Sequence, residues 1–234
     1  GRRRYCRALR GRLMGATVGV VVFPGTNCEM DTVDALEALG GIARTLWHAD
    51  DDLAGIDAVV VPGGFAHGDY LRPGAIARFS PIMVAIARFA AGGGPVVGIC
   101  NGFQVLTEAG LLPGALQKNQ GLKFLCEPAR LRVETTDSVL TQLADTGMEL
   151  AVPINHFEGN FTCDDETLAR LVGEDQVVLR YVENPNGSVD DIAAICNEGR
   201  NVVGLMPHPE RACNPLLGSE DGRVLISSLL AAVA

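Results

Sequence analysis

Three apolar runs, each rich in β-branched residues and each leading into a glycine-rich turn, limit the folds open to this chain most strongly. They are TVGVVVF (17–23), DAVVVPGG (57–64) and GPVVGIC (94–100). Continuous apolar runs of this kind are typical of parallel strands that are buried on both faces of a sheet. In an open parallel sheet, ligands bind beyond the carboxyl ends of the strands. The turns after these three runs are therefore predicted to form one site.

The segments between the runs carry helical patterns. Residues 28–40 and 101–110 both end in glycine, a common helix stop. Residues 74–92 contain Pro81, which predicts a kink or a break in that helix. The alternation of strands and helices predicts an α/β fold: a doubly wound, mostly parallel, flavodoxin-like sheet with flanking helices.

The second half of the chain has a different pattern. Five apolar runs follow one another with few long helices between them: 124–134, 148–154, 177–183, 192–197 and 201–207. We expect shorter, partly antiparallel strands here, which form a smaller region beside the parallel sheet. The last segment, 220–234, has a helical pattern.

Charge is distributed unevenly along the chain. The formal net charge is −9, and residues 1–12 contain six arginines and no acid, so the remainder is more acidic still. An acidic body disfavours nucleic acid as a partner, because attraction to phosphates needs a basic surface. Met14 is interpreted as a natural start, which makes residues 1–13 a non-native or disordered extension and residues 14–234 the folded domain.

Two further features favour a cytoplasmic protein that does not enter a membrane. No apolar run reaches the roughly 18 residues that a transmembrane helix needs. The seven cysteines include no CxxC pair and no spacing typical of a metal site, and their odd number favours reduced thiols over a disulfide framework. We therefore predict no metal on this chain.

The cysteine after the third run has the surroundings of a catalytic nucleophile. GICNG (98–102) has the spacing of the nucleophile elbow G-x-S-x-G, with sulfur in place of oxygen. Gly98 and Gly102 have no side chain that could collide at the sharp turn from strand to helix. The N-terminus of the following helix favours the thiolate form of Cys100, which is the reactive one. A buried cysteine with two chance glycines is the alternative.

A cysteine nucleophile needs a base and a group that orients the base. Among the four histidines, His208 in PHPE (207–210) fits best. The flanking prolines should keep the segment extended, and residues i and i+2 of an extended chain point the same way. Glu210 would then hold the Nδ1 hydrogen of His208 and leave the other ring nitrogen free to take a proton from Cys100. A surface His–Glu pair is the alternative.

Backbone N–H groups that could stabilise a developing oxyanion are predicted at two places. Gly63 and Gly64 allow the backbone to approach a substrate carbonyl, although a plain Pro-Gly-Gly turn is the alternative interpretation. The N–H of Asn101, directly after the nucleophile, is the usual second donor in elbow enzymes.

The remaining histidines are weaker candidates. His67 and His156 lie in glycine-containing loops, where each could bind substrate or cap a turn. His48 follows Trp47 in an edge-like stretch and is expected at the surface.

Four stretches together resemble a known family: VVFPGTNCE (21–29), VVVPGGFAHGDYLRPGAIA (59–77), GICNGFQVLTEAGLLPGAL (98–116) and GLMPHPER (204–211). They are similar to the class I, or triad, glutamine amidotransferases, and the similarity extends over essentially residues 16–232. The first two stretches are the most specific, and they are similar to the glutaminase subunits that serve purine biosynthesis.

The resemblance implies that L-glutamine is the substrate. The nucleophile attacks its side-chain amide, ammonia leaves, and water hydrolyses the resulting thioester without a metal. Together with the residue patterns above, it gives the predicted site: a triad of Cys100, His208 and Glu210, oxyanion donors at Gly64, Phe65 and Asn101, and substrate-binding positions at Gly63, Gln104 and His156.

The resemblance also implies partners. The chain contains only two lysines, Lys118 and Lys123, and neither lies in a GxxxxGK[ST] phosphate loop, so ATP is not expected to bind here. Members of the family supply ammonia to a large ATP-binding synthetase subunit, often with a small accessory subunit. ATP and Mg²⁺ are expected on that partner, and no cofactor is expected on this chain.

Two other functions remain open at this point. A cysteine hydrolase or stress-response protein could use the same elbow, but it would not need GGFAHGDYLRPGA. A non-catalytic binding subunit is disfavoured by the intact triad. Within NHFEGNF (155–161), Phe157 departs from the family pattern, which affects the contacts expected of His156 and Glu158.

Overall fold

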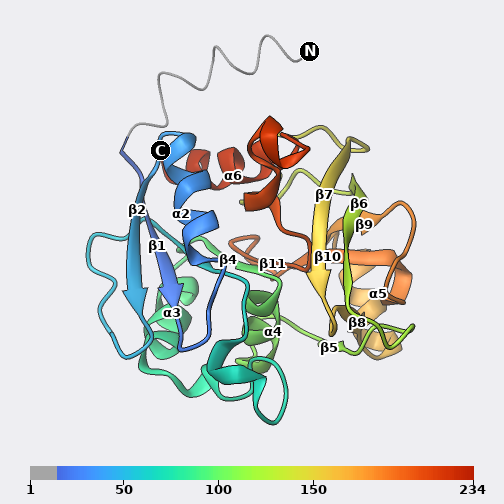
Figure 1. The fold of residues 1–234 in the computed structure, drawn as a ribbon, viewed down its shortest axis with the longest axis horizontal. Helices are drawn as coiled ribbons and strands as arrows, with labels where there is room; N and C mark the ends of the chain where they lie inside the picture. The colour runs from blue at the N-terminus through green and yellow to red at the C-terminus, as the bar shows by residue number, and fades with distance from the viewer. Residues whose placement is uncertain (1–14) are drawn as a thin grey trace.

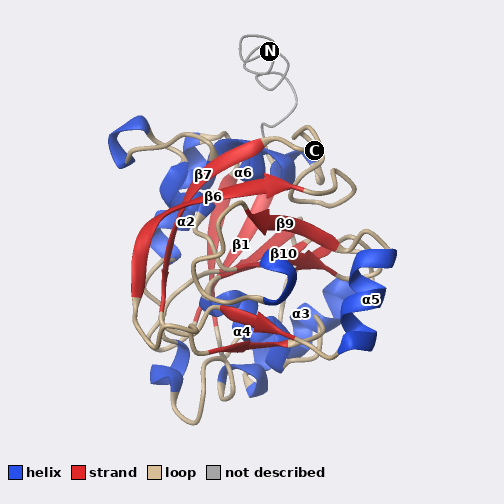
Figure 2. Ribbon diagram, turned by 90° about the vertical axis from the view of Figure 1, so that its right-hand side faces the viewer, coloured by secondary structure: helices blue, strands red, loops and turns tan. Residues whose placement is uncertain are grey.

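The protein, a computed structural model that describes residues 15–234, is built on a nine-stranded sheet with helices on both sides (Figures 1 and 2). The strand order is β2-β1-β3-β4-β11-β10-β9-β6-β7. This arrangement confirms the predicted α/β fold with flanking helices. The interpretation of residues 1–13 as an extension lies outside the described residues.

The parallel half of the sheet consists of five strands: β1 (Thr17–Val22), β2 (Ile42–Trp47), β3 (Ala58–Val61), β4 (Val96–Ile99) and β11 (Val202–Leu205). Every residue of β3 and β4 is buried, as expected of strands covered on both faces. The sequence does not predict β2. Only Leu46 of its six residues is buried, so this edge strand has no continuous apolar run.

The other half of the sheet is antiparallel, as predicted. It contains β6 (Leu125–Val133), β7 (Glu149–His156), β9 (Val177–Tyr181) and β10 (Ile192–Cys196), and β10 joins it to β11. The expectation of short strands is wrong for β6 and β7, which have nine and eight residues. Two further strands, β5 (Ala115–Gln117) and β8 (Asn160–Thr162), pair as a separate ribbon that the sequence does not predict.

Five α-helices flank the sheet within the described chain: α2 (Glu29–Ala38), α3 (Pro81–Ala91), α4 (Asn101–Glu108), α5 (Asp165–Gly173) and α6 (Gly222–Ala231). Short 3₁₀ segments lie at Ala66–Asp69, Ala77–Phe79, Val189–Asp191, Pro209–Ala212 and Pro215–Leu217. Figure 2 shows α2 and α6 on one side of the strands and α3 and α4 on the other.

One predicted helix is broken, as expected, and another helix was not predicted. Pro81 occupies the first turn of α3, after the 3₁₀ segment Ala77–Phe79, so the predicted kink or break at this residue is a break. The sequence does not predict α5, because Leu171 is its one buried residue and its apolar stripe is short. No helix in the described part of the chain is long and apolar enough to cross a membrane.

The loops after the parallel strands meet at one edge of the sheet, as predicted. The Cys28 N–H donates to the Gly63 carbonyl oxygen at 3.2 Å, which joins the loops after β1 and β3. The Cys100 N–H donates to the Leu205 carbonyl oxygen at 2.7 Å. Because β11 runs parallel to β4, the segment that follows β11 arrives beside the segment that follows β4. Residues far apart in the sequence are thereby brought to one site.

Candidate active site

The turn at Cys100 has the strained geometry of a nucleophile elbow. Cys100 has φ 51° and ψ −107° between β4 and α4, and it is 6% exposed. A Cβ atom at Gly102 would lie 1.8 Å from the Val61 carbonyl oxygen, and one at Gly98 would lie 2.7 Å from the backbone of Gly102. The predicted need for both glycines is therefore confirmed.

We expect Gly102→Ala to destabilise the fold, because the new methyl group overlaps the backbone of β3. Overpacking of this kind typically costs about 1–3 kcal/mol, and a rigid backbone contact belongs at the upper end. The measurement is urea unfolding of the variant beside Gly173→Ala, which has open space around the added methyl group. Equal stability of the two variants would show that the elbow tolerates a side chain.

His208 and Glu210 form a buried pair. The Nδ1 of His208 lies 2.6 Å from Oε1 of Glu210, and the two residues are 1% and 3% exposed. The expected reason for this contact is wrong: the segment does not stay extended, because a 3₁₀ turn begins at Pro209. The turn brings Glu210 back beneath the imidazole, and the His208 N–H anchors the loop on the Pro153 carbonyl oxygen at 2.8 Å.

The surroundings of His208 favour its charged form. Burial lowers the pKa of His208, but the Glu210 carboxylate and the Cys100 sulfur raise it, and the resulting pKa lies well above its usual value. The Nε2 of His208 is buried and has no hydrogen-bond partner among the described residues. An imidazolium beside Cys100 suits a thiolate–imidazolium pair, with one nitrogen free for proton transfer.

The predicted oxyanion donors differ in availability. Gly64 lines a cavity in front of Cys100 and has φ 147°, a conformation that favours glycine. Asn101 begins α4, where backbone N–H groups have no helical partner. The Phe65 N–H, in contrast, donates to the Gly25 carbonyl oxygen at 3.0 Å. The geometry therefore leaves Gly64 and Asn101 as the two available donors.

The cavity has a volume of about 250 Å³ and an open mouth. It is lined by Asn27, Cys28, Gly64, Phe65, Asp69, Leu71, Arg72, Pro73, Cys100, Gln104, Phe124, Asn155, His156, Phe157, Glu158 and His208. Gly63 is absent from this lining. A Cβ at Gly63 would lie 2.8 Å from Cε1 of His208, so Gly63 makes room for the triad rather than facing the cavity.

Gln104 and His156 both line the cavity, and hydrogen bonds to neighbouring residues fix both side chains. Gln104 accepts a hydrogen bond from Asn101 Nδ2 at 2.8 Å and donates to the Glu158 carbonyl oxygen at 2.5 Å. The Nδ1 of His156 lies 3.1 Å from Oδ1 of Asn119. Burial, with a contribution from His208, lowers the pKa of His156 to about 4, so its ring is neutral at pH 7.

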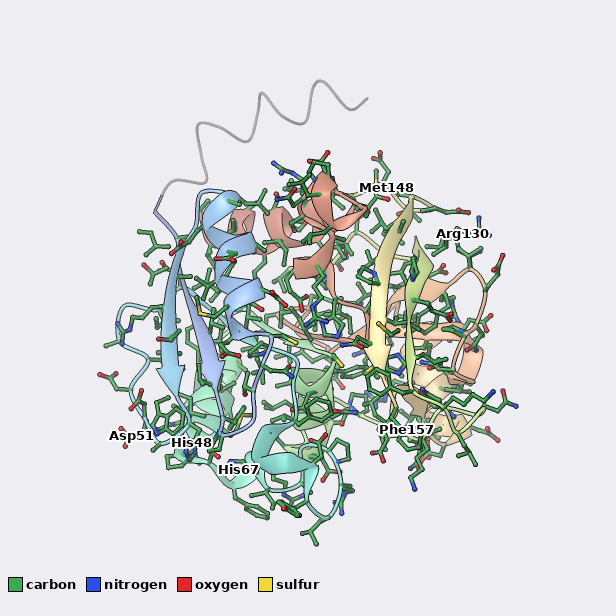
Figure 3. All side chains as sticks on the ribbon, viewed as in Figure 1. His48, Asp51, His67, Arg130, Met148 and Phe157 are labelled. Carbon is green, nitrogen blue, oxygen red and sulfur yellow. The ribbon has the colours of Figure 1, made fainter. Side chains whose placement is uncertain are left out.

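The other two histidines lie away from the cavity. His48 and His67 pack edge to face with ring centroids 5.2 Å apart, and a nitrogen of each lies 3.4 Å from the Ser80 hydroxyl oxygen. Figure 3 shows this pair well separated from Phe157 at the cavity. The suggestion that His67 binds substrate therefore has no support from the structure, and packing in a turn remains its role.

Several cavity residues are absent from the sequence-based site. Burial raises the pKa of Asp69 to about 6, and the nearby Glu158 contributes to this shift. The Oδ1 of Asp69 accepts a hydrogen bond from Asn101 Nδ2 at 3.1 Å. Cys28 and Arg72 also line the cavity. The sequence contains these residues in two unusual motifs, FPGTNC and FAHGDYLRPG. The motifs could have singled them out, but they do not show where the side chains lie.

Comparison with known proteins identifies the class. A sequence model of the CobB/CobQ-like glutamine amidotransferase domain matches residues 16–223, so the chain belongs to the glutamine amidotransferase family. Two solved structures, a putative GMP synthase subunit from Thermoplasma acidophilum and a glutamine amidotransferase from Thermotoga maritima, are 16% and 15% identical with TM-scores of 0.62 and 0.60. They cover 92% and 93% of the chain and show the fold alone.

More similar relatives identify a particular branch of the glutamine amidotransferase family. Proteins named phosphoribosylformylglycinamidine synthase subunit PurQ are 60% identical in Rubrobacter xylanophilus and 55% identical in Koribacter versatilis. Each match covers 92% of this chain, and 97% and 98% of the respective relative. A chain in the structure of PurLQS from Thermotoga maritima is 43% identical with a TM-score of 0.87, over 94% of this chain and 100% of that one. The predicted family is confirmed.

Proposed function

We propose that this chain is the glutaminase subunit of phosphoribosylformylglycinamidine synthase, an enzyme of de novo purine biosynthesis. It hydrolyses glutamine to glutamate and ammonia, and the ammonia converts formylglycinamide ribonucleotide to formylglycinamidine ribonucleotide on a synthetase subunit. The observation that carries this proposal is the buried His208–Glu210 pair beside Cys100, in a chain 60% identical to a PurQ protein. A cysteine hydrolase of another family is not favoured, because the identity extends over 97% of that relative.

The first half of the reaction acylates the cysteine. The Cys100 thiolate attacks the side-chain amide carbon of glutamine, and the N–H groups of Gly64 and Asn101 stabilise the oxyanion that forms. The imidazolium of His208 donates its Nε2 proton to the leaving ammonia. A γ-glutamyl thioester remains, and Glu210 keeps the imidazole in the tautomer with hydrogen on Nδ1.

The second half releases the product. Neutral His208 accepts a proton from a water molecule at Nε2, and the resulting hydroxide attacks the thioester. Glutamate leaves, and the thiolate–imidazolium pair is restored. No step in this cycle calls for a metal or a cofactor, and we propose none on this chain. ATP and Mg²⁺ would act on the synthetase subunit, and the complex, with any small accessory subunit, would work in the cytoplasm.

An exposed apolar rim at the cavity mouth supports a docking face for the synthetase subunit. Phe65 and Phe124 are each 50% exposed, and Tyr70 and Leu71 are 73% and 89% exposed. Three of these residues line the cavity, so a partner that covered them would also close the site from water. Large apolar side chains gathered on one face are typical of protein interfaces.

We expect Leu71→Asp to weaken binding of the synthetase subunit by about 10-fold or more, since it places a charge in an apolar contact. Titration of the labelled variant with the synthetase subunit measures this. Leu216→Asp is the matched control, because Leu216 is 91% exposed and does not line the cavity. Equal affinity of the two variants for the synthetase subunit would show that the docking face lies elsewhere.

The proposed function is tested by glutamate release from glutamine, measured with the chain alone and with the complete complex and its ligands. We expect one glutamate for each formylglycinamidine ribonucleotide formed, at a rate that the synthetase subunit and its ligands increase. Absence of glutamate release in the complete complex would contradict the proposal.

A further inference from the structure

His156, the last residue of β7, lies in the wall of the cavity that also contains Cys100 and His208. It is 3% exposed, and its Nε2 is buried without a hydrogen-bond partner among the described residues. A Cβ at Gly159 would lie 2.3 Å from the Nδ1 and Cε1 of this ring and 2.6 Å from its Nε2. The ring therefore occupies space that a side chain at position 159 would fill.

The hydrogen bonds of Asn119 determine which ring nitrogen of His156 carries the hydrogen. The Nδ2 of Asn119 donates to the carbonyl oxygens of Lys123 and His156, each at 2.9 Å. Its Oδ1 accepts from the Gly159 N–H at 3.1 Å, so all of these partners require the same orientation of the amide. The same Oδ1 lies 3.1 Å from the Nδ1 of His156, and because an amide oxygen only accepts, this Nδ1 donates.

The His156 ring consequently presents an acceptor to the cavity. Burial and the nearby His208 lower the pKa of His156 to about 4, so at pH 7 the ring has one hydrogen, on Nδ1. That hydrogen is directed to Asn119, which is not part of the cavity wall, and the remaining nitrogen, Nε2, has a lone pair. A buried acceptor without a donor costs free energy, and a ligand that supplies the donor removes this cost.

The neighbouring residue of β7 supplies a second acceptor. The Asn155 carbonyl oxygen lies 3.7 Å from the Cys100 sulfur, and Asn155 also lines the cavity. Gly64 and Asn101 offer backbone N–H donors near the same cysteine. A carboxamide has an oxygen that accepts and two N–H hydrogens that it donates. Two donors and two acceptors around one nucleophile therefore match both ends of a carboxamide group.

We propose that Nε2 of His156 accepts a hydrogen bond from the side-chain amide N–H of glutamine, and so selects a carboxamide over a carboxylate or an ester. This inference rests on the proposed function. The γ-carboxylate of glutamate has no hydrogen when ionised, so its oxygen would face the lone pair of Nε2 and be repelled. A site that hydrogen-bonds a substrate N–H rejects analogues without it, because its own buried group is left unpaired. The contact thereby favours binding of glutamine and release of glutamate.

Comparison of an amide with an ester tests this selection. L-Glutamine and the γ-methyl ester of L-glutamate present the same carbonyl group, but the ester has no N–H there. In the complete complex, His156→Leu should lower kcat/KM for glutamine by about 10- to 100-fold and change the value for the ester by about 2-fold or less. His48→Leu, which changes a histidine outside the cavity, should keep both values.

A purely structural defect in His156→Leu would lower both values alike, so an unchanged ratio of the two would overturn the proposal. That result, with glutamate still released by the wild-type complex, would leave the proposed function standing. A wild-type complex that released no glutamate would instead contradict the proposed function itself.

Nitrogen NMR of the histidines needs no turnover and keeps the His156 side chain, so it decides even where His156→Leu fails to fold. The full chain carrying Cys100→Ala is used, because glutamine is not consumed there. At pH 7 we expect a hydrogen on Nδ1 of His156 and none on Nε2, and a shift of the Nε2 resonance with glutamine but not with glutamate. A hydrogen on Nε2, or an Nε2 resonance that glutamine does not move, would overturn the proposal.

Discussion

Cys100→Ala is expected to abolish glutamine-dependent synthesis by the assembled complex, and to leave ammonia-dependent synthesis close to the wild-type rate. Removal of a nucleophile that acts together with its base costs several orders of magnitude in turnover, here about 10⁴-fold or more. Ammonia supplied in the buffer should bypass the glutaminase site, because the proposed synthetase subunit would carry the later chemistry. Both rates are measured on one preparation, with glutamine and then with an ammonium salt as the nitrogen donor.

A matched control separates the loss of chemistry from the loss of a packed cysteine. Cys196 is a fully buried cysteine in β10 that does not line the cavity, and Cys196→Ala should keep both activities. Loss of ammonia-dependent synthesis in Cys100→Ala, with the complex still assembled, would contradict the proposed division of work between the subunits.

Glu210→Gln is expected to lower glutaminase turnover by about 10- to 10³-fold. In a serine enzyme, replacing the triad acid by its amide costs about 10⁴ in turnover. A cysteine depends less on its base, because a thiol ionises far more easily than a hydroxyl. The structure adds a second expectation: Glu210→Gln removes a charge that raises the pKa of His208, so this pKa falls. The pH at which the imidazolium is lost, and with it acylation, should therefore move down.

Steady-state kinetics of the assembled complex across pH, beside a thermal melt of the variant, check this expectation. The melting temperature should be nearly unchanged, since the amide has the shape of the carboxylate. Wild-type turnover with an unshifted pH profile would remove Glu210 from the mechanism. A strongly lowered melting temperature would instead show that the Glu210 carboxylate stabilises the fold.

The parts of the fold that could be predicted are those whose signal is local. β1, β3 and β4 are buried on both faces, so their sequences are continuous apolar runs, and the glycines beside Cys100 are required by contacts within one turn. The edge strand β2 buries one residue of six and carries no such signal. Prediction therefore succeeded for these fully buried strands and failed for the edge strand β2.

The parts of the site that could not be predicted depend on contacts between distant segments. The position of Cys28 beside His208 follows from the meeting of the loops after β1 and β11, which no spacing in the sequence encodes. The hydrogen bond from Asn101 to Asp69 likewise joins two loops. Even the His208–Glu210 contact, which was predicted, arises from a 3₁₀ turn that the extended-chain argument did not foresee.

The most direct measurement locates the covalent intermediate. The complete complex is mixed with glutamine, quenched in acid, digested and analysed by mass spectrometry, with Cys100→Ala treated in parallel. We expect a γ-glutamyl group on the peptide that contains Cys100, and no such group in the variant. A γ-glutamyl group on Cys28 or on any other residue, or glutamate formed by Cys100→Ala at the wild-type rate, would contradict hydrolysis through a thioester at Cys100.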